Sequence, residues 1–431
     1  MARLFLFTGN PAEAKKHSPR VGREIAPVGL LLYFFFSKGK QEVEMVLKPK
    51  VHSLTGRITP DLMRKAFKNV KRNRGAAGVD KQSVKMFEAN LDQNPDALMR
   101  ALKQRTFVPK PTRRTYIPKG KGKLRPLGIP AVRDRVAQEV LRLLLSPIFE
   151  SLFHEDSYGF RQGRNCHQAV ERVLEIWHQG YRHVLDADIR GFFDNIPHSV
   201  IMTGLSAVVA DGNILGLVEK FLRAGIMENG VFKPTTVGTP QGGVISPLLA
   251  NIALNSLDWH LAQHDVRFVR YADDFVVLCR SESRAKEALI MVERHVAVLG
   301  LELSPEKTHV TTFKKGFSFL GFDISSRSVK MRDKSTEKFK DRIRELTRRS
   351  RNFDAKVVDK VNQVIRGTAN YFATPYSHNR RLFEKLDSWI RMRLRCMKFK
   401  RKWKTDNKRL RLKHFRNRGL LNLRDFYAAP A

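Results

Sequence analysis

Two adjacent aspartates, Asp273 and Asp274, stand in the stretch RYADDFVVLCRS between two runs of strand-forming residues. This pattern predicts a β-hairpin with two like charges at its tip. Carboxylates held together away from bulk water repel, and each raises the pKa of the other unless a proton or a cation relieves the charge. A divalent metal ion would do so, and the pair therefore indicates a metal site. On these residues alone the alternative is a solvated turn, because aspartate favours turns.

Asp188, in the stretch LDADIRGFF, is the carboxylate that could complete such a site, at the end of a predicted buried strand. Nucleotide polymerisation is an in-line displacement at phosphorus, and two metal ions roughly 3.5 to 4 Å apart stabilise its attacking and leaving oxygens. Mg²⁺ prefers a few carboxylates together with water and substrate phosphates. Asp186 shares the strand face of Asp188, because side chains two apart point the same way, and we interpret it as a strand-edge or supporting residue.

The segments around these aspartates predict strands, helices and hairpins in alternation. A helix is expected from residue 60, because Thr59 precedes a proline and apolar residues then recur at helical spacing. No regular βαβ repeat is present, so an α+β fold with an antiparallel centre is predicted, followed beyond about residue 335 by helices. The other main elements expected are two strands over 113–130 and helices over 131–153, from about 246 and over 282–300.

The charge of the chain points to its partner. Its 431 residues include 80 Lys and Arg against 42 Asp and Glu, a net charge of +38. The excess is densest at Arg391–Arg418, where 14 of 28 residues are basic and only Asp406 is acidic. Nucleic acid fits this charge better than a membrane surface, which usually takes a basic amphipathic helix or a lipidation signal.

Targeting and redox signals are weak. No window approaches the ~20 apolar residues of a membrane span, so no membrane partner is expected. The apolar run VGLLLYFFF, residues 28–36, lacks a small-residue cleavage site, and we expect a cytoplasmic location. The three cysteines lie far apart without metal-ligand spacing: Cys166, Cys279 and Cys396.

The motifs of the chain resemble, in sequence order, those of group II intron-encoded reverse transcriptase/maturases. YADD, DADIRGFFDNI and GTPQGGVISPLLANI resemble the palm motifs of that family. IPKGKGKLRPLGIPAVRDRVAQEVL and SYGFRQGRNCHQAV resemble its fingers motifs, and FSFLGFDI its segment near the primer strand. The resemblance implies a right-hand polymerase fold: fingers over 51–185, palm over 186–330, an α-helical thumb/maturase domain over 331–418 and a tail over 419–431.

The resemblance also implies an activity and its partners. The family consists of RNA-directed DNA polymerases that copy RNA into cDNA with two Mg²⁺ ions, for which Mn²⁺ can substitute, and that assist intron splicing and retrohoming. The implied partners are group II intron RNA, an RNA template with a DNA primer, and dNTPs. Two alternatives stay open: a domesticated reverse transcriptase in DNA repair or phage defence, and a splicing-only RNA-binding maturase. Intact Asp188, Asp273 and Asp274 argue against the second.

Site residues follow from the same resemblance. Asp188 and Asp273 resemble the two principal metal ligands, with Asp274 beside them and the backbone carbonyl of Ile189 as a further ligand. The implied nucleotide-binding residues are Lys119 and Arg125 for the triphosphate, Phe193 as the ring that obstructs a ribose 2′-OH, Gln241 and Gly242 against the nascent base pair, and Lys307 as a candidate general acid. Without the resemblance, the basic residues would be read as solvated turns and Phe193 as core.

The C-terminal helices correspond to the thumb and maturase domain, which grip template-primer and intron RNA. RNA helices are recognised mostly through backbone and shape, which a basic face suits. The alternative is a solvated amphipathic helix whose aromatic residues belong to the core. The candidate nucleic-acid-binding residues are Arg391, Arg395, Lys400, Arg401, Lys402 and Lys404, and the interleaved aromatic residues are Trp389, Phe399, Trp403 and Phe415.

The chain departs from the family pattern at both ends. Many members continue into a DNA-binding region and a metal-dependent endonuclease with His and Cys ligands, and no such cluster is found here. We therefore expect no target-cutting activity of its own. Residues 1–50 match no motif, and we interpret them as an N-terminal extension, with Met45 as an alternative start.

Overall fold

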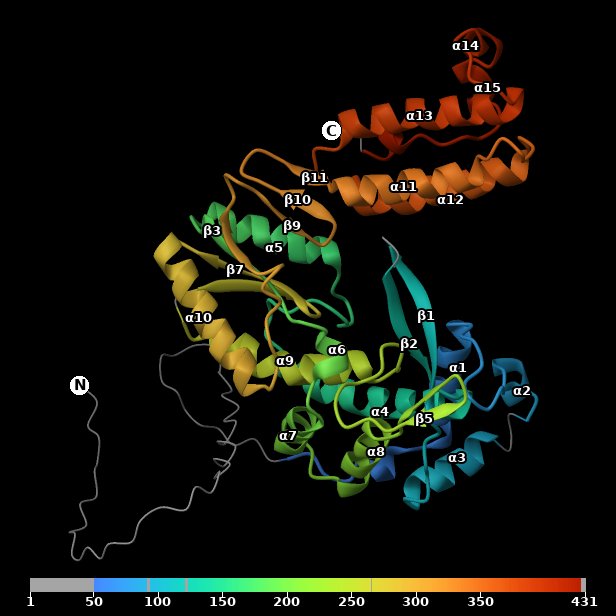
Figure 1. The fold of residues 1–431 in the computed structure, drawn as a ribbon. Helices are drawn as coiled ribbons and strands as arrows, with labels where there is room; N and C mark the ends of the chain where they lie inside the picture. Colours follow the sequence, from blue (N-terminus) through green and yellow to red (C-terminus); the bar gives the residue numbers. More distant parts are fainter. Residues whose placement is uncertain (1–49, 91–93, 121–122, 265, 428–431) are drawn as a thin grey trace, which may run out of the picture. The chain divides into compact units, whose positions relative to one another are not determined.

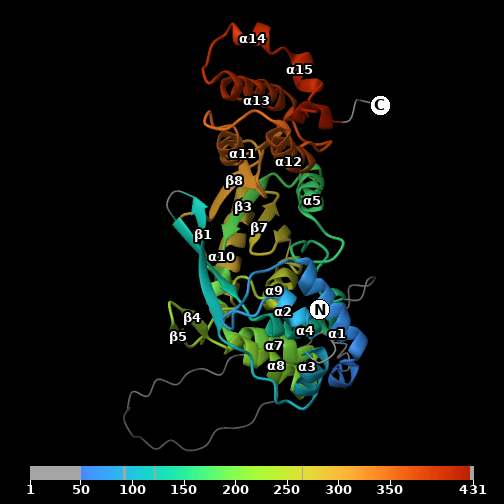
Figure 2. The same cartoon turned by 90° about the vertical axis from the view of Figure 1, so that its right-hand side faces the viewer.

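The computed structural model of the chain describes residues 50–90, 94–120, 123–264 and 266–427, whose fold is shown in Figures 1 and 2. The extension predicted over 1–50 lies outside these residues except for Lys50. Strands and helices alternate as far as β11 (Val329–Met331), and the main elements after it are helices. The α+β fold with a helical C-terminal region is confirmed, and the boundaries between fingers, palm and helical domain stay predictions.

A four-stranded antiparallel sheet in the order β6-β7-β3-β8 carries the candidate site. Neighbouring residues of its strands enter different hydrophobic cores: Val184 and Val276 belong to one core, and Leu185 and Val277 to the other. Because successive side chains of a strand point to opposite faces, the sheet separates the two cores. Its strands are β3 (His183–Asp188), β6 (Arg267–Tyr271), β7 (Asp274–Cys279) and β8 (His309–Thr312).

The core that contains Leu185 is built largely from helices. The predicted first helix is α1, and the Thr59 hydroxyl caps it by accepting from Leu62 N at 3.3 Å. The helices predicted over 131–153, from about 246 and over 282–300 are also confirmed. The helices lining this core are α1 (Pro60–Arg72), α2 (Val84–Glu88), α3 (Asn94–Lys103), α4 (Val132–Glu150), α7 (His198–Val208), α8 (Gly212–Leu222), α9 (Ser246–Ala262) and α10 (Glu282–Val298).

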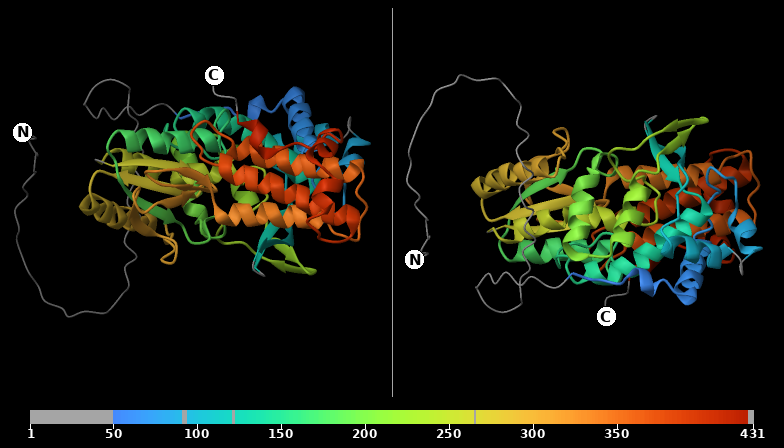
Figure 3. Two further views of the ribbon diagram at one scale, coloured as in Figure 1. Left: turned by 90° about the horizontal axis from the view of Figure 1, so that it is seen from above. Right: turned by 90° about the horizontal axis from the view of Figure 1, so that it is seen from below.

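The core that contains Val184 joins the sheet to the C-terminal helices. It includes α5 (Cys166–His178) and a small sheet in the order β11-β10-β9, with β9 at Phe317–Phe319 and β10 at Phe322–Ile324. The orange and red helices lie side by side in Figures 1 and 3. These are α11 (Asp333–Leu346), α12 (Ala355–Phe372) and α13 (Arg380–Phe399), followed by the short α14 (Asp406–Arg409) and α15 (Leu412–Arg416).

The hairpin predicted over 113–130 is confirmed as β1 (Thr112–Gly120) and β2 (Lys123–Ile129). Two strands that the sequence did not predict extend this sheet, β4 (Ile226–Glu228) and β5 (Val231–Lys233). Each has three residues with no alternation of burial, so neither gives a sequence signal. Among the described residues, no helix is both long and apolar enough to span a membrane.

Candidate active site

The two aspartates lie at a tight turn between β6 and β7, as the sequence predicted. Tyr271 pairs with Asp274 across the hairpin, which leaves Ala272 and Asp273 as the turn. Ala272 has φ +61°, in the left-handed region that residues with a Cβ rarely adopt. The site therefore begins on a strained turn, and such strain persists only where the surroundings hold the backbone.

Asp188, at the end of β3, lies directly opposite Asp274 on β7. Residues facing each other across an antiparallel pair have Cβ atoms about 4.5–5.5 Å apart. Asp186 and Asp188 alternate with Ala187, which is buried in the opposite core, so they lie on the same face as Asp274. The structure thus brings three carboxylates together on one face, with Asp273 at the adjoining turn.

Burial and the charges of neighbouring carboxylates raise the pKa of Asp186, Asp273 and Asp274. The pKa of Asp274 is raised to about 7, chiefly by burial and then by the charges of Asp186, Asp273 and Asp188. Burial likewise raises the pKa of Asp273 and raises that of Asp186 to about 6. A carboxyl group that keeps its proton up to near-neutral pH, as Asp274 does chiefly because of burial, can exchange that proton for a metal cation.

Lys307 neutralises part of this charge. Its Nζ lies 2.7 Å from Asp188 Oδ2 and forms an ion pair with that carboxylate. The segment before Lys307 is fixed to the end of β3, because Ser304 N donates to Asp188 O at 2.7 Å and Ile189 bridges Leu303. Arg190 N donates to Glu302 O at 2.8 Å. This hydrogen bond and the one from Ser304 N form the bridge, and neither of them involves the Ile189 carbonyl.

The donor set suits a hard divalent cation, which prefers carboxylate and carbonyl oxygens. Within the described residues, no three acidic, histidine or cysteine side chains already converge tightly enough to enclose an ion. Asp188 is turned toward Lys307 in this arrangement. Occupation by Mg²⁺ would therefore require Asp188 to release Lys307 and turn toward Asp273 and Asp274.

The predicted triphosphate contacts lie on the fingers hairpin. Arg125, on β2, is exposed, and its positive charge opposes in part the effect of burial, which raises the pKa of Asp273. This places a guanidinium within electrostatic reach of the turn. Lys119 belongs to β1, but its side chain lies outside the described part of the structure.

The GTPQGG loop is packed against the fingers strand β2. Gly128 N donates to Gln241 O at 2.7 Å, and a Cβ on Gly242 would lie 2.4 Å from Gly128 O. Gly242 has φ +113°, so a side chain here would be strained as well as obstructed. The Gln241 side chain lies 3.4 Å from Asp194 Oδ2, on the short helix α6 (Phe192–Asn195) that follows β3.

Phe193, on α6, is half-buried at the edge of the site. Its backbone carbonyl accepts from Thr239 N at 2.8 Å, which ties α6 to the GTPQGG loop. The position expected to select the sugar is therefore fixed against this loop.

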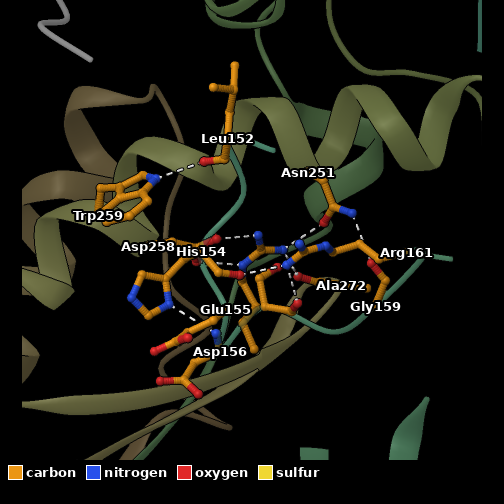
Figure 4. A network of polar contacts seen from close by, with 12 residues as sticks. Leu152, His154, Glu155, Asp156, Gly159, Arg161, Asn251, Asp258, Trp259 and Ala272 are labelled. Carbon is orange, nitrogen blue, oxygen red and sulfur yellow. Dashed lines mark hydrogen bonds and ion pairs between the residues drawn. The ribbon is translucent and has the colours of Figure 1, made fainter. Parts of the chain in front are cut away.

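The sequence did not single out Arg270, whose buried side chain donates a hydrogen bond to the turn. Its side chain is 1% exposed and forms a two-pronged ion pair with Asp258 on α9, which is equally buried. Nε donates to Asp258 Oδ1 at 2.7 Å, and Nη1 donates to Asn251 Oδ1 at 2.9 Å and to Ala272 O at 2.8 Å. Figure 4 shows this network, in which the strained residue Ala272 is bound through its own carbonyl.

Of the six candidate nucleic-acid-binding residues, four form hydrogen bonds or ion pairs within the protein, and the other two are exposed lysines. Lys400 donates to the carbonyls of Arg349 and Arg351, and Arg395 donates to Leu410 O at 2.9 Å. These side chains hold the helical domain together. The other members with intramolecular contacts are Arg391, with Asn422 and Ser388, and Arg401, with Asp406; Lys402 and Lys404 are exposed.

The aromatic residues of this region also divide. Phe415 is buried, and Trp389 and Phe399 are half-buried, as expected for core. Trp403 is 62% exposed, and the Arg401 guanidinium carbon lies 4.1 Å from its ring centroid. Of the four, Trp403 alone offers a ring to a partner.

Two family models match successive parts of the chain. Residues 109–324 match the model described as reverse transcriptase (RNA-dependent DNA polymerase). Residues 336–417 match the model described as group II intron, maturase-specific domain.

Two curated relatives align with a large part of the chain. Protein YkfC of Escherichia coli is 35% identical over 321 residues, or 64% of this chain and 84% of that protein. Group II intron-encoded protein LtrA of Lactococcus lactis is 30% identical over 341 residues, or 63% of this chain and 56% of that protein. The chain therefore spans little more than half the length of LtrA. A solved structure titled "Partial Cas6-RT-Cas1--Cas2 complex" aligns at 22% identity and a TM-score of 0.36, over 57% of this chain and 42% of that one.

Proposed function

The chain belongs to the reverse transcriptases, the RNA-directed DNA polymerases, and carries the maturase-specific domain of group II introns; from this premise we propose that it copies RNA into cDNA at Asp188, Asp273 and Asp274 and binds intron RNA through its C-terminal helices. One observation carries the proposal. Asp186, Asp188 and Asp274 share a face of two adjacent antiparallel strands, Asp273 lies at the adjoining turn, and burial and mutual repulsion raise the pKa of Asp274 to about 7. The proposed setting is the cytoplasm, and the proposed biological role is splicing and retrohoming of the host intron.

Each part of the site has a task in this proposal. Asp188, Asp273, Asp274 and the Ile189 carbonyl would hold two Mg²⁺ ions, which stabilise the attacking and leaving oxygens of an in-line displacement. Lys119 and Arg125 would bind the triphosphate, since an ammonium supplies a point charge and a guanidinium a planar fork for phosphate oxygens.

Three further residues would orient the substrate and move a proton. Phe193 would exclude a 2′-OH, and the backbone at Gln241 would support the new base pair. Lys307 donates to Asp188 in the described arrangement, so it must leave that carboxylate before it can give a proton to the departing pyrophosphate.

The direct test is extension of a DNA primer on an RNA template with dNTPs and Mg²⁺. Template-dependent cDNA of full length supports the proposal. A protein that binds structured intron RNA and promotes splicing but extends no primer under any divalent metal would favour the splicing-only alternative.

We expect the Mg²⁺ requirement to depend on pH. The pKa of Asp274 is raised to about 7, so its folded form keeps a proton up to near-neutral pH, and that proton competes with the metal. As the pH falls below 7, the half-saturating Mg²⁺ concentration should rise by up to about tenfold per unit. Magnesium titrations of primer extension and of the thermal midpoint at several pH values measure this.

The raised pKa of Asp274 also makes the stability of the metal-free protein depend on pH. A carboxyl whose pKa is higher in the folded than in the unfolded chain stabilises the metal-free fold at low pH, and that contribution is lost as the pH rises through about 7. Asp274→Asn should weaken both dependences near pH 7 and leave the dependence due to Asp186, whose pKa is raised to about 6. A half-saturating Mg²⁺ concentration that stays constant between pH 6 and pH 8, chosen as roughly one unit either side of that pKa, would contradict the assignment.

RNA binding by the helical domain is tested best with the exposed lysines. Lys402→Gln with Lys404→Gln removes two cations that form no ion pair within the described residues, and it leaves the structural Lys400 and Arg401 in place. If both contact phosphate, the slope of log affinity against log salt should become shallower by roughly 1.4 to 1.8, because each contact releases condensed counterions. Filter binding of structured intron RNA over a salt series measures the slope.

A matched control is Lys286→Gln on α10, whose ion pair with Glu282 is exposed. It should leave the salt slope unchanged. Primer extension at low salt should survive the double substitution, because the carboxylates are untouched. An unchanged slope in the double variant would mean that this stretch is a solvated face, as in the alternative drawn from the sequence.

A further inference from the structure

Phe160, in the loop between α4 and α5, combines two unusual properties. It is 53% exposed, and its φ is +62°, in the left-handed region where a bulky side chain is rarely found. An apolar ring displayed on a strained backbone persists only when neighbouring structure holds it. Residues with such strained backbones concentrate at functional sites.

The loop is bound to the catalytic hairpin through backbone hydrogen bonds. Tyr158 N donates to Arg270 O at 2.8 Å, and Arg270 N donates to Asp156 O at 2.9 Å. These two hydrogen bonds form an isolated parallel β-bridge between Ser157 in the loop and Arg270 on β6. The strand that ends in the YADD turn therefore also fixes the residues just before Phe160.

Gly159 brings the loop into direct contact with the turn itself. A Cβ on Gly159 would lie 2.2 Å from Ala272 N, and the Gly159 carbonyl accepts from Asn251 Nδ2 at 2.9 Å (Figure 4). On the other side, buried Arg161 donates from Nη1 to His154 O at 2.6 Å and to Ser157 O at 2.7 Å. Phe160 is thus held between two anchored neighbours.

The Phe160 ring meets Phe193, the residue proposed to exclude the 2′-OH. Their centroids are 6.1 Å apart and their planes 81° apart, an edge-to-face contact. Phe193 also contacts Phe192, which is 2% exposed, with centroids 5.4 Å apart. The Phe193 ring therefore contacts both a buried ring that belongs to the core and an exposed ring that belongs to the loop.

We propose that Phe160 is a positioning residue that confines the Phe193 ring and so sets the preference for deoxyribonucleoside over ribonucleoside triphosphates. This inference rests on the proposed role of Phe193. A steric gate discriminates only while its ring is kept in one place, and the two rings that contact Phe193 are those of Phe192 and Phe160. The strained backbone at Phe160 holds its exposed ring against Phe193.

The decisive variant is Phe160→Gly. Glycine adopts positive φ freely, so this change removes the ring and relieves the backbone. Loss of one aromatic contact should lower the ratio of kcat/KM for dNTP over rNTP by roughly 2- to 12-fold. The thermal midpoint should stay at or above that of the parent protein, whereas a merely structural role predicts a lower midpoint. Phe160→Tyr keeps the ring and should keep the ratio.

Phe193→Val separates this inference from the role on which it rests. If that change leaves the ratio unaltered, Phe193 is no gate, and both ideas fall together. If Phe193→Val lowers the ratio and Phe160→Gly does not, the positioning inference alone is wrong. In the double variant, Phe160→Gly should add nothing further, because its effect passes through Phe193. A further loss of equal size would overturn positioning in favour of direct contact with substrate.

Discussion

Replacing Asp188 or Asp273 by asparagine is expected to abolish cDNA synthesis, lowering the rate of primer extension by roughly 10³-fold or more. Asparagine keeps the shape of the side chain but lacks the charge that holds a divalent cation. Binding of structured RNA should change little, because the basic helices α11 to α13 are untouched. Single-turnover extension at saturating RNA, with binding measured separately, checks both halves of the expectation.

Asp186→Asn is the matched control for this experiment. Asp186 lies on the same face, is mostly buried and raises the pKa of Asp274, so the change removes an equivalent charge from the same surroundings. As a supporting residue it should cost far less, within about 10- to 100-fold in metal affinity. Loss of activity as complete as in Asp188→Asn would make Asp186 a ligand and would contradict the assignment. Full activity in Asp188→Asn or Asp273→Asn would contradict the assignment of these two residues as metal ligands.

Arg270→Met is expected to cause the largest loss of stability, about 3–5 kcal/mol of unfolding free energy. The change leaves Asp258 with a buried, unpaired carboxylate and removes a donor from both Asn251 and Ala272. Denaturant unfolding gives the free energy. Hydrogen exchange on β6 and β7 should show the hairpin opening first.

Two comparisons sharpen that result. Arg270→Met combined with Asp258→Leu should recover much of the loss, because a buried ion pair replaced by apolar groups of similar volume is often neutral. Lys286→Gln breaks an ion pair whose side chains are 66% and 62% exposed, and should cost less than about 1 kcal/mol. A single Arg270 variant as stable as the Lys286 variant would show that the network does not hold the turn.

The sequence predicted those parts of the site whose signals are local. The YADD hairpin, the strand that ends at Asp188 and the Thr59 cap each depend on neighbours in the chain, and the structure contains all three. The roles assigned to these residues stay predictions. Pairing of Asp188 with Asp274 required only that the two strands be adjacent and antiparallel.

Long-range and conformational features could not be predicted in this way. Arg270 looks like one more residue of a strand run, and its partner Asp258 lies on a helix twelve residues earlier. Nothing in the residue type of Phe160 signals a positive φ. A count of basic residues likewise gives Lys400 and Lys402 equal weight, although both are exposed and Lys400 donates to two backbone carbonyls.

The sheet that divides the two cores also limits how the length of the gene product can vary. Residues of β3 and β7 alternate between the two cores, so one inserted or deleted residue in either strand would exchange every following side chain between the two faces. In β3 this would turn Asp188 toward the core that now receives Ala187. The turn at Asn229 and Gly230, between the half-buried β4 and the exposed β5, has no such coupling. Surviving length variants from random insertion should therefore accumulate at that turn and be absent from β3 and β7.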